Sequence, residues 1–81
     1  MDNVEQKLKK AMSQIFGIPV NKISEDASPD TIEEWDSLRH MNLILALEEA
    51  FNVKFLDEDI VELLSYKLLL GELKKLVKKP H

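Results

Sequence analysis

The chain has 81 residues, of which 44% are hydrophobic and 32% charged, and its formal net charge is -4 at pH 7. A single small domain spanning residues 1–81 is expected, because a chain of this length buries only about 60–65% of its unfolded surface and cannot enclose a large catalytic cleft. The acidic balance argues against nucleic acid as a partner, and the lack of cysteine excludes disulfides and thiolate metal sites.

No stretch of the sequence is typical of a membrane span. The longest unbroken apolar run, Leu43 to Leu47, is far shorter than the roughly 20 residues that cross a bilayer. The first residues, Met1 to Glu5, lack the basic and apolar regions of a secretory signal. We therefore expect a cytoplasmic protein without membrane insertion.

A first amphipathic helix is predicted over residues 3–16, where apolar residues recur at three- and four-residue spacing. Gly17 and Pro19 should end it. The next twenty residues show no convincing period, and a connection of that length usually contains a short turn, which we expect to begin at Ser28. Five large apolar residues should hold this loop against the core: Ile18, Val20, Ile23, Ile32 and Trp35.

A second helix is predicted from Ser37 to about Phe51. One face of it should enter the core, and the opposite face should meet solvent. The core face consists of Leu43, Ile44, Leu47 and Phe51, and the solvent face of Arg39, Asn42, Ala46 and Glu49. Leu38, Met41 and Leu45 form a separate apolar strip next to Ser37. Such a strip is either covered by another part of the chain or is a docking surface, and the residues alone leave both interpretations open.

The C-terminal third of the chain predicts two more helices. A short third helix fits Asp57 to Leu64, with acids in its first turn, and Ser65 can cap a fourth helix that ends near Val77, before Pro80. The buried face of the fourth helix should contain Leu68, Leu69, Leu73, Leu76 and Val77. Between the second and third helices we expect a loop with Val53 and Phe55 turned inward. The predicted fold class is all-α, a small four-helix bundle (three main helices plus a short third helix) with a long loop between helices 1 and 2.

Ser37 is the most informative residue, since it stands in the step Asp36-Ser37-Leu38 at the start of an apolar helix. The free backbone N–H groups and the positive dipole end of a helix N-terminus favour a negatively charged group such as phosphate. Asp and Ser before an apolar run are also ordinary capping residues. The tripeptide by itself is compatible with both roles.

The residues that follow add a longer pattern. Asp36-Ser37-Leu38 precedes Ala46-Leu47-Glu48-Glu49-Ala50-Phe51 and then Asp57-Glu58-Asp59-Ile60. With the helices described above, this pattern covers nearly the whole chain and resembles the acyl carrier protein family. In that family the serine matching Ser37 is esterified to 4′-phosphopantetheine taken from coenzyme A, and the arm's thiol carries acyl groups as thioesters. Asp36 matches the residue that helps the phosphopantetheinyl transferase to bind its metal ion.

The resemblance also implies partners. It predicts a monomeric carrier, not an enzyme, that presents acyl groups to acyl-transferring and condensing enzymes of fatty-acid, lipid or polyketide-type synthesis. Residues 21–37 and 48–62 each contain six acids and one Lys, so the partners should offer basic docking patches. The expected partner surface consists of Leu38, Met41, Leu45, Glu48, Glu49, Asp57 and Glu58. By the same analogy, an idle acyl chain should lie between the second and third helices.

Several residues depart from the fatty-acid members of the family. Trp35 replaces a small residue, Arg39 and Asn42 replace acids, and Ala50 replaces a third consecutive Glu. The second helix is therefore less acidic than usual, which suggests a specialised carrier with its own partner set. Two alternatives stay open: an aminoacyl or peptidyl carrier, whose usual Gly beside the motif is absent, and an unmodified helical interaction module in which Ser37 is only a cap.

Two further interpretations of the site are rejected on the sequence. His40 lies three residues after Ser37, yet the nucleophile elbow and glycine-rich oxyanion loop of a hydrolase are missing, so we interpret His40 as a surface residue and His81 as a terminal one. The acids Asp57, Glu58, Asp59 and Glu62 lack the ligand spacing and central Gly of an EF-hand. We therefore expect no metal site.

Overall fold

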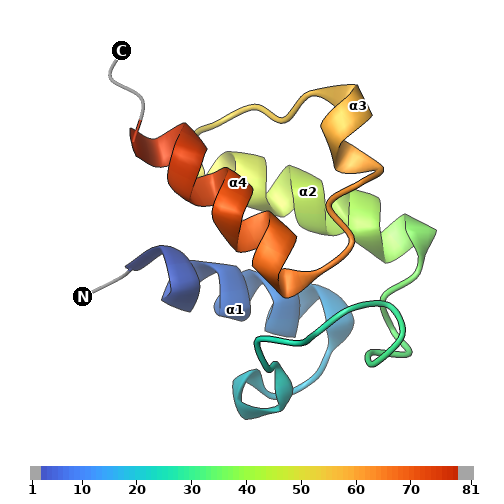
Figure 1. Ribbon diagram of the computed structural model, residues 1–81. Helices are drawn as coiled ribbons and strands as arrows, with labels where there is room; N and C mark the ends of the chain where they lie inside the picture. The colour runs from blue at the N-terminus through green and yellow to red at the C-terminus, as the bar shows by residue number, and fades with distance from the viewer. Residues whose placement is uncertain (1–2, 79–81) are drawn as a thin grey trace.

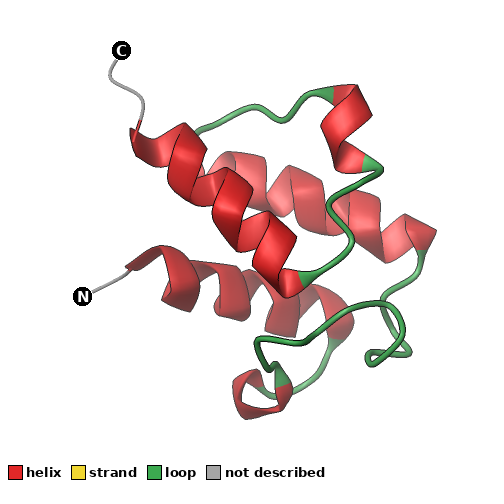
Figure 2. Cartoon of the chain, viewed as in Figure 1, coloured by secondary structure: helices red, strands yellow, loops and turns green. Residues whose placement is uncertain are grey.

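The computed structural model describes residues 3–78, and these residues form four α-helices without a strand. The helices are α1 (Asn3–Phe16), α2 (Ser37–Phe51), α3 (Asp57–Ile60) and α4 (Tyr66–Lys78), with a 3-10 turn η1 (Val20–Lys22) after α1. α1 and α2 run antiparallel, and α4 crosses α2 at an angle (Figure 1). The predicted all-α bundle is confirmed, including the long loop between α1 and α2 (Figure 2).

The helix ends follow local sequence signals. α1 ends at Gly17, which has φ +71° and donates its N–H to the Ser13 carbonyl at 2.9 Å. Only glycine adopts this left-handed conformation without steric cost. α2 ends at Asn52, which is also left-handed at φ 55°. α4 begins after Ser65, whose hydroxyl oxygen accepts the Leu68 N–H at 3.1 Å, as predicted for a cap. The predicted stop at Pro80 lies outside the described residues.

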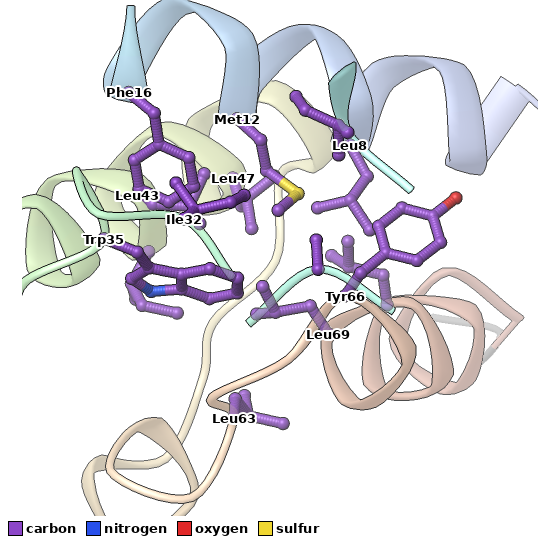
Figure 3. Packing of buried hydrophobic residues seen from close by; sticks show 14 of the residues in the cluster. Leu8, Met12, Phe16, Ile32, Trp35, Leu43, Leu47, Leu63, Tyr66 and Leu69 are labelled. Atoms are coloured by element: carbon purple, nitrogen blue, oxygen red, sulfur yellow. The ribbon is translucent and has the colours of Figure 1, made fainter. Parts of the chain in front are cut away.

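The core is one cluster to which all the main helices contribute (Figure 3). α1 packs against both α2 and α4. The predicted core face of α2 is confirmed, since Leu43, Ile44 and Leu47 are buried and Phe51 is half-buried. Phe55 is buried and Val53 half-buried, so the connection after α2 turns inward as expected. None of the described helices has the length and apolar character needed to span a membrane.

The long loop is packed against this core. Ile23, Ile32 and Trp35 are buried and Ile18 is half-buried, as predicted. The expected turn at Ser28 is present, because its carbonyl accepts the N–H groups of Thr31 at 3.0 Å and Ile32 at 2.9 Å. Val20 is instead exposed, because it begins η1, a surface turn that buries none of its residues. The buried Ala27 fixes the loop to α4, since its carbonyl accepts the Tyr66 N–H at 2.9 Å.

Two predictions for the C-terminal third were wrong. Leu68 and Val77 are exposed, and the buried line of α4 runs instead through Tyr66, Leu69 and Leu73. Leu68 lies one residue, or about 100°, away from Leu69 around the helix, and so it leaves this line. α3 also ends at Ile60 rather than near Leu64.

The early end of α3 coincides with a contact from α2. In a longer helix the Ile60 carbonyl would accept the Leu64 N–H. Here that carbonyl is bonded to the ring of His40 at 2.8 Å and also accepts the Leu63 N–H at 3.3 Å, while the Leu64 N–H donates to the Glu62 carbonyl at 2.9 Å. A tertiary hydrogen bond from α2 thus replaces the bond that would have extended α3.

Candidate functional site

Ser37 is the first residue of α2, and its side chain is exposed. The residue before it, Asp36, is the N-cap: its Oδ1 accepts the Arg39 N–H at 2.8 Å, and its carbonyl accepts the His40 N–H at 2.8 Å. Within the described chain the capping role therefore belongs to Asp36. The Ser37 hydroxyl stays at the surface, beside the free N–H groups of the first turn.

Arg39 places a positive charge next to this cap. Its Nη1 lies 3.2 Å from Asp36 Oδ2 and 3.4 Å from the Glu34 carbonyl oxygen. The side chains of Arg39 and Asp36 are 46% and 55% exposed, so the ion pair contributes at most about 1 kcal/mol. Arg39 is thus on the solvent side of α2, as predicted, and it holds the Asp36 carboxylate only weakly.

A groove of about 480 Å³ lies beside Ser37, between the first turns of α2 and the segment around α3. Asp36 and Ser37 both line it. Its other lining residues are Pro29, Trp35, His40, Met41, Ile60, Val61 and Leu64. The structure brings Asp36, Ser37 and Met41 together with residues of the long loop and of the α3 segment that the sequence did not assign to the site.

Three buried residues at the base of the groove, Trp35, His40 and Ile60, are joined by hydrogen bonds through His40. The indole Nε1–H of Trp35 donates to His40 Nδ1 at 3.0 Å, and His40 Nε2 lies 2.8 Å from the Ile60 carbonyl oxygen. Because an indole N–H can only donate, Nδ1 must accept and Nε2 must carry the proton. The imidazole is therefore neutral, and both of its nitrogens are bonded within the protein.

The interpretation of His40 as a surface residue was wrong, since only 5% of the residue is exposed. A sequence signal for this burial exists. With Asp36 as the N-cap, Trp35 is the residue before the cap and His40 is the fourth helical residue, the two positions that pack together in a hydrophobic staple. Their rings stack with centroids 6.1 Å apart. The staple position, once the cap is known, predicts this contact.

A Ser-His catalytic pair is not supported by this geometry. A general base for Ser37 needs a ring nitrogen that can accept the hydroxyl proton. Nδ1 of His40 accepts the Trp35 N–H and Nε2 donates to Ile60, so neither nitrogen is free for that role. Among residues 3–78, no group of three or more His, Asp or Glu side chains could hold a metal ion.

The apolar strip of α2 is exposed and not covered by α3 or by the loop. Leu38, Met41 and Leu45 are 72%, 45% and 57% exposed. The alternative in which another part of the described chain covers the strip is therefore excluded. Three more large apolar residues are exposed around α3, namely Leu56, Val61 and Leu64. Val61 and Leu64 fall within the helix predicted from the sequence, and none of the three was predicted to lie at a functional surface.

The acids predicted for the partner surface fall into two groups. Glu49, Asp57 and Glu58 are exposed and free to meet a partner. Glu48 is half-buried, and its Oε2 accepts the Phe55 N–H at 2.9 Å. Glu48 therefore stabilises the connection after α2, and the hydrogen bond to Phe55 holds its carboxylate in place.

The chain was compared with known proteins. No family model matches it. The acyl carrier protein of Buchnera aphidicola subsp. Schizaphis graminum is 44% identical over 63 residues, which are 78% of this chain and 80% of the relative. The acyl carrier protein of Buchnera aphidicola subsp. Baizongia pistaciae is 35% identical over 77 residues, which are 95% of this chain and 99% of the relative. The first alignment covers about four fifths of each chain, and the second covers nearly the whole length of both.

Proposed function

Because the chain belongs to the acyl carrier protein family, we propose that it carries acyl groups on a 4′-phosphopantetheine arm attached to the Ser37 oxygen. When attached, the arm supplies a thiol that holds acyl groups as thioesters. The chain itself supplies the attachment point and the surface that partners recognise, and it is not an enzyme. The observation that carries the proposal is the exposed hydroxyl of Ser37 at the first position of α2.

The residues around Ser37 fit a phosphate-linked group. α2 has 15 residues, and the N–H groups and dipole at its N-terminus favour a negative charge on the Ser37 oxygen. Asp36 Oδ2 is bonded only through a half-exposed ion pair with Arg39, so this oxygen can turn to a metal ion in the transferase. An unmodified module in which Ser37 serves as the cap is not favoured, because Asp36 is the cap.

We infer that partners dock on Leu38, Met41 and Leu45, with the exposed acids Glu49, Asp57 and Glu58 at the edge. Apolar contacts supply most of the energy at the centre of such an interface, and the acids attract a basic patch and orient it. The partners are the phosphopantetheinyl transferase and the acyl-transferring and condensing enzymes of fatty-acid, lipid or polyketide-type synthesis. The proposal treats residues 1–81 as one monomeric, cytoplasmic domain.

The test is a modification assay on the purified chain. The protein is incubated with coenzyme A and a broad-specificity phosphopantetheinyl transferase, and its intact mass is measured. The wild type should gain the mass of one phosphopantetheine group, and Ser37→Ala should gain none. Ser24→Ala, which changes an exposed serine in the long loop, is the matched control and should be modified like the wild type. No gain in the wild type, with a transferase shown to be active on another carrier, would overturn the proposal.

A further inference from the structure

The groove beside Ser37 is closed at its base by three buried residues, Trp35, His40 and Ile60, which we call the floor triad. Hydrogen bonds of 3.0 Å and 2.8 Å join them in that order. The other side of the triad faces the core. There the Trp35 ring lies 5.1 Å from the ring of Phe16 in α1, centroid to centroid. The triad therefore separates the groove from the centre of the bundle.

The walls of the groove differ from its floor. Met41, Val61 and Leu64 line it with exposed apolar side chains. An alkyl group beside Ser37 can cover these side chains without disturbing any hydrogen bond. Burial of apolar surface on both partners favours such a contact.

A chain that goes deeper through the floor triad has to separate Trp35 from His40 or His40 from Ile60. Either separation leaves a buried N–H group and its acceptor without a partner, which costs far more than repacking apolar side chains. A floor made only of Leu, Ile and Val would carry no such penalty, because its side chains can part and close again. The hydrogen bonds thus make the floor resistant to an apolar chain.

We propose that the floor triad determines the cargo of this carrier: a chain attached through Ser37 lies in the groove against Met41, Val61 and Leu64 and does not enter the core of the bundle. The inference rests on the proposed attachment at Ser37. It keeps the expected location of an idle acyl chain, between the second and third helices, and places the chain in the surface groove there. The cargo class that fits is a short acyl group, or one whose far end stays accessible to a partner enzyme. Trp35 and His40 act here as positioning residues, since they keep the base of the groove closed and do not bind the phosphopantetheine arm themselves.

The experiment compares two cargoes in three forms of the protein. Wild type, Trp35→Phe and Tyr66→Phe are each loaded from acetyl-coenzyme A and from octanoyl-coenzyme A with the transferase, and intact mass confirms loading. Trp35→Phe keeps an aromatic ring and removes the N–H donor to His40. Tyr66→Phe is the matched control, because it removes a hydroxyl that donates to Glu5 at 3.1 Å from a buried ring outside the groove. The readouts are the methyl NMR shifts of Leu47 and Leu69, the indole N–H shift of Trp35, and Tm.

In the wild type and in Tyr66→Phe, the acetyl and octanoyl forms should share the same core methyl shifts, and their Tm values should agree within about 1 °C. The indole N–H of Trp35 should also keep its shift. In Trp35→Phe the octanoyl group should move the Leu47 and Leu69 methyl signals and raise Tm by several degrees over the acetyl form, because the weakened floor admits the chain.

Two results would overturn the inference. Octanoyl-dependent shifts of Leu47 and Leu69 in the wild type would show that the chain passes the floor. Identical behaviour of the two cargoes in Trp35→Phe would show that the hydrogen bond to His40 does not exclude the chain. A protein that gains no mass in the loading step would instead overturn the attachment at Ser37, so the two failures are distinguishable.

Discussion

The indole N–H of Trp35 donates a 3.0 Å hydrogen bond to Nδ1 of His40, joining the residue before the cap of α2 to the fourth residue of that helix. His40 in turn bonds the Ile60 carbonyl, which ends α3. A single imidazole therefore connects the long loop, α2 and α3 directly beneath Ser37. The groove next to the proposed attachment site depends on these two bonds for its shape.

Replacing His40 with Ala should destabilise the fold strongly. The substitution leaves the Trp35 N–H and the Ile60 carbonyl without their partner and opens a cavity, so we expect a loss of about 2–4 kcal/mol in the free energy of unfolding. Urea denaturation followed by circular dichroism measures it. Arg39→Ala, one residue earlier on the exposed side of α2, should cost at most about 1 kcal/mol. Equal losses in the two variants would contradict the role given to His40.

Asp36 can be tested for two separate roles. Asp36→Asn keeps a side-chain oxygen for the Arg39 N–H and should leave stability nearly unchanged, whereas Asp36→Ala removes the cap and should cost about 0.5–2 kcal/mol. Both changes remove the carboxylate, so both should slow modification of Ser37 by the transferase. The measurements are thermal unfolding and the initial rate of mass gain. A wild-type rate in Asp36→Asn would rule out the metal-assisting role.

The two glycines of the chain should respond to alanine with opposite signs. At both positions an added Cβ would meet nothing within 4 Å, so the backbone conformation alone determines the effect of alanine on stability. Gly17 has φ +71°, and Gly17→Ala should cost about 1 kcal/mol because alanine is strained there. Gly71 is exposed inside α4, and Gly71→Ala should stabilise the fold by about 0.5–1 kcal/mol. Urea denaturation of the two variants measures the change in the free energy of unfolding. If this change had the same sign in both variants, Gly17 would not be in the left-handed conformation described here.

The docking role that we propose for the apolar strip predicts an effect on partner recognition without an effect on folding. Leu38 is 72% exposed, so Leu38→Ala should change stability by no more than about 0.5 kcal/mol. If Leu38 lies at the centre of the interface, the variant should lower kcat/KM for the transferase by about tenfold. Leu68→Ala, the same change at an exposed position of α4, is the control and should keep the wild-type value. Similar kcat/KM values for Leu38→Ala and Leu68→Ala would show that Leu38 is not part of the partner surface.

Much of the fold was predictable because its signals are local. The bounds of α1 and α2 coincide with the predicted residues 3–16 and 37–51, since the apolar period, Gly17 and the Asp36-Ser37 step all act within one or two turns of the chain. The Ser65 cap is local in the same way. The family followed from motifs of the same kind, and the similarity to two acyl carrier proteins supports it.

The groove and its floor were not predictable in this way. His40, Leu68 and the length of α3 were all assigned from their own segments, and the assignments were wrong because the packing of the segments against one another was not considered. His40 is buried by Trp35 and by Ile60, which lies twenty residues further along the chain. Leu68 is exposed because α4 turns Tyr66, Leu69 and Leu73 to the core instead.

The sequence by itself thus determined the helices, the position of Ser37 at the start of one of them and the family to which the chain belongs, because capping, helical period and motif spacing depend on neighbouring residues. The local hydrogen bond to Arg39 makes Asp36 and not Ser37 the cap. The tertiary structure alone decided that the strip of Leu38, Met41 and Leu45 is left uncovered and that a hydrogen-bonded His40 closes the groove. These features depend on which segments meet in space, and a polar side chain such as His40 can be buried only where the fold brings it both a donor and an acceptor.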